Sequence, residues 1–223
     1  MKKIISLALA FILIMSLGAS AFAEDLDVSS NSDSPVEVKG DVNGNVTLTD
    51  TEGKTVNVSG DVSGNITLQI NNDSIDGTNT DNTIEVGGKV GGDVSLQNGS
   101  DKNIITVDGD AGGVRLSGTG WNLYNPGITE NVITVGGNVS NTVFLFEASN
   151  NKIKVGGDVG EGVGEVVTVV YGCNNNVVIV EGEVKGIIND GCLSTTIYVG
   201  ETTSLSGVDG FLVGLKDKAD KNI

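Results

Sequence analysis

Histidine is absent from this 223-residue sequence, and arginine, proline and aromatic residues are scarce. The chain holds two prolines, two cysteines and a single arginine, Arg115, and aromatic residues make up 4%. Without histidine it lacks the most common general base and metal-binding side chain near neutral pH. No carboxylate pair with a neighbouring lysine or arginine stands out, as enzymes that cleave polysaccharides generally require. We therefore predict a protein that is not an enzyme and has no resident cofactor.

Basic residues are outnumbered by acidic ones, 13 against 29, which gives a net charge of −16. Because phosphate binding needs a basic surface, this balance disfavours nucleic acids and anionic membranes as partners. The 33 glycines are too many for a helical protein.

The N-terminus has the pattern of a secretory signal peptide. Lys2 and Lys3 precede an uncharged apolar run over residues 4–17, and Ala21-Phe22-Ala23 matches the small-x-small cleavage pattern. The alternative is an uncleaved membrane anchor. Cleavage before Glu24 predicts a protein that is secreted, extracellular or held at the cell surface, with no membrane insertion. We divide the chain into a signal peptide (1–23), a disordered segment (24–35), a repeat domain (36–210) and a C-terminal cap or tail (211–223).

A repeat of the form N-x-I-x-V-x-G-x-V-x-x-x-V-x-L dominates the rest of the chain, most clearly from Asn82 to Leu96. Its central valine, the anchor, recurs every 19 to 28 residues, at Val38, Val58, Val86, Val107, Val135, Val155, Val180 and Val199. Apolar β-branched residues at steps of two predict short strands with one buried face. The repeat therefore predicts an all-β fold, a single parallel β-helix (solenoid) of seven to eight coils.

Glycine marks the predicted corners of each coil. It lies two residues after the anchor in seven copies, and a second glycine follows four residues later in five. Asn141 takes this second place in the fifth copy. We attribute these positions to a backbone with positive φ, which glycine and then asparagine tolerate best.

An asparagine precedes the anchor by four residues in five consecutive copies, with Thr195 in the eighth. The residues are Asn82, Asn103, Asn131, Asn151 and Asn176. Stacked coils would place these amides about 4.8 Å apart, where each donates to one neighbour and accepts from the other. The alternative is that asparagine only marks the turn before each strand.

These repeats resemble those of right-handed parallel β-helix proteins of the secreted bacterial type, which commonly carry asparagine ladders. The V-x-G-D-V-x-G-N-V wording is also similar to that of the polymer-forming bactofilins. Both resemblances cover residues 36–200 and imply a fold rather than an activity.

Cys173 and Cys192 occupy the same place in consecutive copies, seven residues before the anchor. Adjacent coils would bring them within the Cα separation that a disulfide accepts, about 4.4–6.8 Å. Export to an oxidising compartment favours this disulfide. The alternative is two reduced cysteines in the core.

The residue after the first corner glycine is usually acidic. Stacking would form a column from Asp41, Asp61, Lys89, Asp110, Asn138, Asp158 and Glu183. Closely spaced carboxylates attract cations, so Asp41, Asp61, Asp110 and Asp158 are candidate ligands for Ca²⁺. The alternative is that these carboxylates cap corner amides at a solvated edge.

Three long connections, at about 70–81, 117–130 and 164–175, should project on one side of the solenoid. The middle one contains Trp121, Asn122 and Tyr124, a candidate binding site for a sugar or a peptide. The alternative is that both rings fold back over the solenoid. We place Phe144 and Phe146 nearby, with one on each face.

The leading hypothesis from the sequence is a secreted, non-catalytic structural or adhesin-like protein that contacts a cell-surface glycan or protein. One alternative is a carbohydrate- or cation-binding module that uses the long loops. Another is a subunit that polymerises end to end by self-association.

Overall fold

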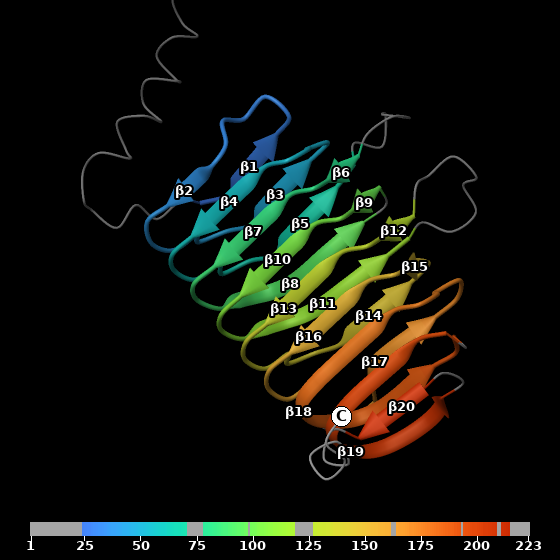
Figure 1. Ribbon diagram of the computed structural model, residues 1–223. Helices are drawn as coiled ribbons and strands as arrows, with labels where there is room; N and C mark the ends of the chain where they lie inside the picture. The colour runs from blue at the N-terminus through green and yellow to red at the C-terminus, as the bar shows by residue number, and fades with distance from the viewer. Residues whose placement is uncertain are drawn as a thin grey trace, which may run out of the picture.

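The chain folds into a parallel β-solenoid of about seven turns in a computed structural model (Figure 1). All described elements are strands, and none of the described residues forms a helix long and apolar enough to cross a membrane. The structure describes residues 24–70, 78–97, 99–118, 127–161, 164–192, 194–208 and 211–214, with side chains described up to residue 200. The all-β solenoid predicted from the repeat is confirmed.

Two walls of parallel strands make up most of each turn. The anchor wall contains β2 (Val36–Val38), β4 (Thr55–Val58), β7 (Thr83–Val86), β10 (Ile104–Val107), β13 (Val132–Val135), β16 (Lys152–Val155) and the first residues of β18 (Val177–Asp190) and β19 (Thr196–Val208). The second wall contains β1 (Leu26–Ser29), β3 (Val46–Thr49), β5 (Ile66–Gln69), β8 (Val90–Gln97), β11 (Ala111–Ser117), β14 (Val143–Phe146) and β17 (Glu165–Val170).

A short third sheet closes the middle turns. It contains β6 (Asn79–Thr80), β9 (Ser100–Asp101), β12 (Ile128–Thr129) and β15 (Ala148–Ser149). It lies between the end of each second-wall strand and the start of the next anchor-wall strand.

Equivalent residues of successive repeats stack in register. Ile105 pairs with Ile84 on one side and Ile133 on the other, and all three side chains are buried. Since side chains alternate between the two faces of a strand, each turn sends one set inward and the other outward. The core is therefore built of rows of valine, isoleucine and leucine along the solenoid axis.

The N-terminal segment corrects one prediction. Within residues 24–35, which we expected to be disordered, Leu26–Ser29 form β1, and β1 pairs in parallel with β3. Leu26 and Val28 are buried because they continue the core rows of Val46 and Leu48. The sequence already shows the same alternation of apolar residues here, with Leu26 and Val28 lying 20 residues before Val46 and Leu48.

At the C-terminus, β20 (Phe211–Gly214) pairs in parallel with the start of β19. The rest of the predicted cap and tail, 215–223, lies outside the described residues, as does the predicted signal peptide, 1–23.

The corner glycines also require a different explanation from the one predicted. Of the seven glycines that follow the anchors, only Gly40 has a positive φ, at 128°. At the others, a neighbouring coil lies too close for a side chain. A Cβ at Gly137 would overlap Asp110 Oδ1 and would lie 2.9 Å from the carbonyl carbon of Gly109. Glycine is therefore required here by close approach between coils rather than by backbone conformation.

Candidate functional site

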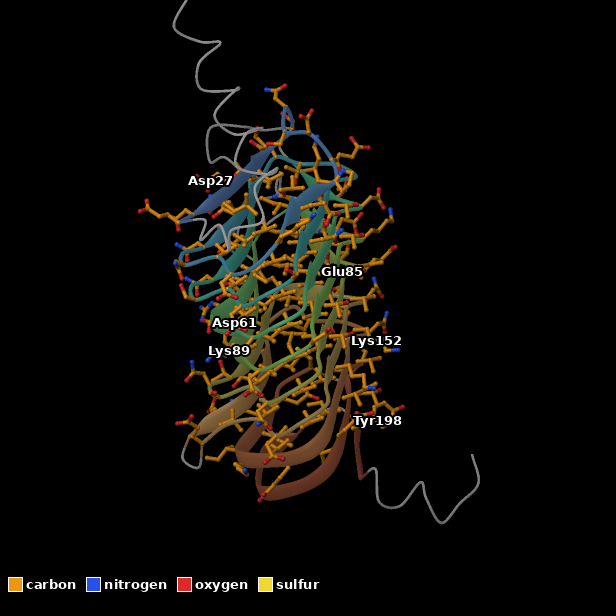
Figure 2. The ribbon with its side chains drawn as sticks, turned by 90° about the vertical axis from the view of Figure 1, so that its left-hand side faces the viewer. Asp27, Asp61, Glu85, Lys89, Lys152 and Tyr198 are labelled. Carbon is orange, nitrogen blue, oxygen red and sulfur yellow. The ribbon has the colours of Figure 1, made fainter. Side chains whose placement is uncertain are left out.

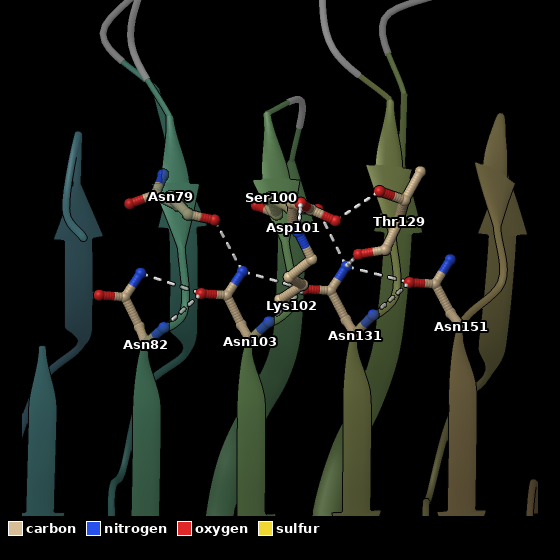
Figure 3. A network of polar contacts seen from close by, with 9 residues as sticks. All are labelled: Asn79, Asn82, Ser100, Asp101, Lys102, Asn103, Thr129, Asn131 and Asn151. Atoms are coloured by element: carbon tan, nitrogen blue, oxygen red, sulfur yellow. Dashed lines mark hydrogen bonds and ion pairs between the residues drawn. The ribbon is translucent and has the colours of Figure 1, made fainter. Parts of the chain in front are cut away.

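The asparagine ladder forms as predicted, at the turn that leads into each anchor-wall strand. Asn103 donates from its backbone N–H and from Nδ2 to Asn131 Oδ1, at 3.0 and 2.9 Å, and Asn131 donates in the same way to Asn151 Oδ1 (Figure 3). The same pair of bonds joins Asn82 to Asn103 and Asn151 to Asn176. The ladder residues are 0–2% exposed. Every link satisfies two donors that water does not reach, so the ladder is structural.

The ladder also reaches the third sheet. Asn103 Nδ2 donates to the carbonyl oxygen of Asn79, and Asn131 Nδ2 donates to that of Ser100. Asn79 is itself fully buried, and its Oδ1 accepts from the backbone N–H and the hydroxyl of Thr51. Sequence reasoning missed Asn79 and Thr51, although both lie seven residues before an anchor, because the residue type at this position changes from copy to copy.

The acidic column at the first corner is a second hydrogen-bonded row. Asp41 Oδ1 accepts the backbone N–H of Asp61, and Asp61 Oδ1 accepts that of Lys89, both at 2.9 Å. Asp110 and Asp158 make the same bond to the next coil, with the N–H groups of Asn138 and Glu183. These carboxylates therefore cap corner amides, which is the alternative that we weighed against cation binding.

Asp158 carries an additional contact, because Lys185 Nζ lies 2.5 Å from its Oδ2. The backbone hydrogen bond from Glu183, followed by this lysine, lowers the pKa of Asp158. Across the described part of the chain, no group of three or more Cys, Asp or Glu side chains is arranged to hold a metal ion.

The second corner carries a matching row that sequence reasoning missed. Asn45 Oδ1 accepts the backbone N–H of Asn65, and Asn65 Oδ1 accepts that of Asp93. Asp25 begins this row by accepting from Asn45. The sequence does contain a signal for this row, because the residue after the second-corner glycine is Asn45, Asn65 and Asp93 in successive copies.

The two cysteines lie in adjacent coils, 4.3 Å apart, at the C-terminal end of the inward row that contains Ala148. Their juxtaposition is as predicted, but the predicted disulfide is not formed, since both are buried free thiols. Burial raises the pKa of Cys173 to about 12. Asp190, which is also buried, accepts the backbone N–H of Cys192 through Oδ1.

The outward rows of the second wall form a continuous surface, which we call the outer strip. It consists of Asp27, Ser29, Thr47, Thr49, Thr67, Gln69, Ser95, Gln97, Arg115, Ser117, Phe144, Phe146, Thr168 and Val170. All of these side chains except Thr168 are exposed or half-buried, and the charged ones are Asp27, at the N-terminal end, and Arg115.

Aromatic rings gather at the C-terminal end of the outer strip. The Phe144 and Phe146 rings are parallel within 5° with centroids 6.5 Å apart, and Tyr171 stacks on Phe146 at 5.5 Å. Arg115 Cζ lies 4.6 Å from the centroid of Phe144. Tyr171 is 55% exposed. These four residues form the aromatic platform.

The platform corrects the prediction that Phe144 and Phe146 lie on opposite faces. They are two residues apart in one strand, so both point outward while Val143 and Leu145 point inward. The predicted loop residues Trp121, Asn122 and Tyr124 lie outside the described residues. Gly118, the last described residue before this connection, donates its backbone N–H to the carbonyl oxygen of Phe146.

The outer surface of the anchor wall has a different character. In Figure 2, Glu85, Lys152 and Tyr198 lie along one side of the solenoid, whereas Asp61 and Lys89 of the first corner lie along the other. Lys154 forms a 2.9 Å ion pair with Glu181. The anchor wall and the corner therefore carry charge, and the outer strip is nearly free of it.

No family model matches this chain, and neither the curated proteins nor the solved structures yield a match. The resemblance to β-helix proteins holds for the fold. The resemblance to bactofilins rests on the wording of the repeat alone.

Proposed function

We propose that this chain is an exported, non-catalytic solenoid that acts outside the cell as a structural or adhesin-like protein. The observation that carries the proposal is that most polar side chains of the ladder and the corners are occupied by bonds between coils. Asn131, for example, holds two donors of Asn103, and Asp110 holds the amide of Asn138. What remains for contact with other molecules is the outer surface of a rod.

A non-catalytic role fits the composition and the placement of the charged groups. The sequence has no histidine, and its only arginine stacks on Phe144. The carboxylates of Asp41, Asp61, Asp110 and Asp158 are each engaged by a backbone amide. A general acid and base at one substrate would need carboxylates that are free to exchange protons with it.

Export is the part of the proposal that can be tested first. The full chain, produced in a bacterial host, should leave the cytoplasm and begin at Glu24, as N-terminal sequencing of the released protein would show. A variant with Leu7 and Leu9 changed to Asp should remain in the cytoplasm at full length, because charges interrupt the apolar run. Recovery of the unchanged chain in the cytoplasm, with Met1 and Lys2 still present, would refute export.

End-to-end polymerisation is a second candidate, favoured by the N-terminal coil. The described sheet begins and ends with β1 and β2, which both belong to this coil and each pair with one strand only. Strand edges of this kind are templates for pairing with another chain. Light scattering of the purified protein over a hundredfold range of concentration would reveal such polymers by a rise in mass.

We further propose that the two cysteines become linked after export. The two thiols would lose two protons and two electrons to an exported thiol–disulfide oxidoreductase, forming one S–S bond. Support comes from their 4.3 Å separation in adjacent coils. Mass spectrometry of the released protein should show a mass two hydrogens below that of the reduced chain.

A further inference from the structure

We infer that the outer strip and its aromatic platform bind a neutral polysaccharide chain that lies along the solenoid axis. The inference rests on the proposed role outside the cell, and it gives the contact surface and the class of partner.

Hydroxyl and amide groups repeat along the strip at the spacing of the coils. Thr47 pairs in register with Thr67, and Thr67 with Ser95. Gln97 pairs with Ser117, which in turn pairs with Phe146. Successive side chains are therefore about 4.8 Å apart along a straight line. Hydroxyls and amides both donate and accept, as the hydroxyls of a sugar do, so a long polyol can form many equivalent bonds here.

The aromatic platform supplies the second element of sugar recognition. A pyranose ring has an apolar face of C–H groups, which packs flat on an aromatic ring. Because Phe144, Phe146 and Tyr171 stack on one another and Arg115 covers Phe144, the ring surface left for a sugar is that of Tyr171, which is 55% exposed. Arg115 lies over Phe144 and is exposed, so its guanidinium can donate to hydroxyls at the edge of the platform.

Charge selects the class of polysaccharide. The chain carries a net charge of −16, and the corner beside the strip holds Asp41, Asp61, Asp110 and Asp158. A uronic acid or sulfated polymer would be repelled by this field, whereas a neutral one would not. A strip with almost no charge on such an acidic protein is the surface that a neutral polymer can approach without desolvating carboxylates.

Affinity electrophoresis of the full chain tests the inference. Native gels would contain xyloglucan, galactomannan or mixed-linkage β-glucan, with polygalacturonate as the polyanionic comparison. We expect retardation by at least one neutral polymer and none by polygalacturonate. Tyr171→Ala should weaken retardation about tenfold, as expected for an exposed aromatic anchor, and Phe146→Ala should weaken it as well because Phe146 stacks on Tyr171 and holds its ring in place.

Tyr198→Ala is the matched control, because Tyr198 is a tyrosine on the outer surface of the anchor wall (Figure 2). It should bind as the unchanged protein does, and all variants should melt within a few degrees of it. The inference is overturned if no neutral polymer retards the protein, if polygalacturonate binds equally well, or if Tyr171→Ala and Tyr198→Ala lose the same affinity. Tyr171-dependent dimers without retardation would also overturn it, since the platform would then join two copies of the chain. None of these outcomes bears on export, which N-terminal sequencing decides separately.

Discussion

Replacing Asn131 by alanine tests how much the ladder contributes to stability. Asn131 is 1% exposed, and its Oδ1 accepts both the backbone N–H and the Nδ2 of Asn103. Its Nδ2 donates to Asn151 Oδ1 and to the carbonyl oxygens of Ser100 and Thr129. Alanine removes all of these bonds without providing an opening for water.

The expected loss follows from the donors that remain buried. Asn103 would keep two N–H groups without their acceptor, and each such group costs about 1–3 kcal/mol. We therefore expect Asn131→Ala to lower the free energy of unfolding by about 2–5 kcal/mol. Asn65→Ala is the matched control, because Asn65 also accepts an amide of the next coil but is exposed. Water can replace its bond, and the loss should stay below about 1 kcal/mol.

Urea unfolding followed by circular dichroism would measure both variants against the unchanged chain. The comparison uses the midpoint and the slope, so that a change in cooperativity is separated from a change in stability. Equal losses for the buried and the exposed asparagine would refute the reasoning, because burial alone distinguishes the two sites.

Further predictions concern the corners, the thiols and a surface ion pair. Gly137→Ala should lower the free energy of unfolding by about 1–3 kcal/mol, because its new Cβ meets the backbone of Gly109. Gly127→Ala, whose Cβ would have its nearest contact at 3.6 Å, should leave the free energy of unfolding nearly unchanged in the same urea assay. Burial raises the pKa of Cys173 to about 12, so the contribution of this thiol to the free energy of unfolding is fully present below the unfolded pKa of about 8.5 and is lost as the pH rises toward 12. Between about pH 7.5 and 10, the free energy of unfolding of the unchanged chain should therefore fall more than that of Cys173→Ala. Once the two cysteines are oxidised, the disulfide that closes the loop from Cys173 to Cys192 should raise the free energy of unfolding by about 3 kcal/mol, and reduction by dithiothreitol should remove this gain. Lys185→Ala should leave the melting temperature almost unchanged, since water and salt screen its ion pair with Asp158 at the surface, and a clear drop in thermal melts would contradict this placement.

The sequence was sufficient to predict the solenoid because stacking imposes one condition on every turn. Inward positions such as Ile84, Ile105 and Ile133 must be apolar and must keep their phase, and that requirement produces a visible repeat. The asparagine ladder was predictable for the same reason. The third sheet was not, because its strands are two residues long and the residues seven positions before each anchor, such as Thr51, Asn79 and Ala148, share a position but no chemical type.

For the corner glycines, the sequence pattern was correct but the physical reason that we gave for it was wrong. A one-dimensional pattern contains no distance between coils, so a glycine required by positive φ and one required by a close neighbour look identical. At Gly137 the neighbour is the side chain of Asp110, which reaches across to the amide of Asn138. The glycine and the aspartate after it therefore act together. The glycine of one coil makes room for the aspartate of the previous coil, and this aspartate fixes the next amide.

The outward surface was the least predictable part, and the reason is physical. Outward side chains need not match their neighbours for the coils to stack, so selection for folding leaves no period in these rows. A site on this surface is built across coils rather than along the chain. Arg115, Phe144 and Tyr171 are 27 to 29 residues apart in sequence, yet they belong to three successive second-wall turns and form one platform. Any contact surface of this solenoid should therefore be sought by aligning the turns at their anchors and reading the outward rows along the axis.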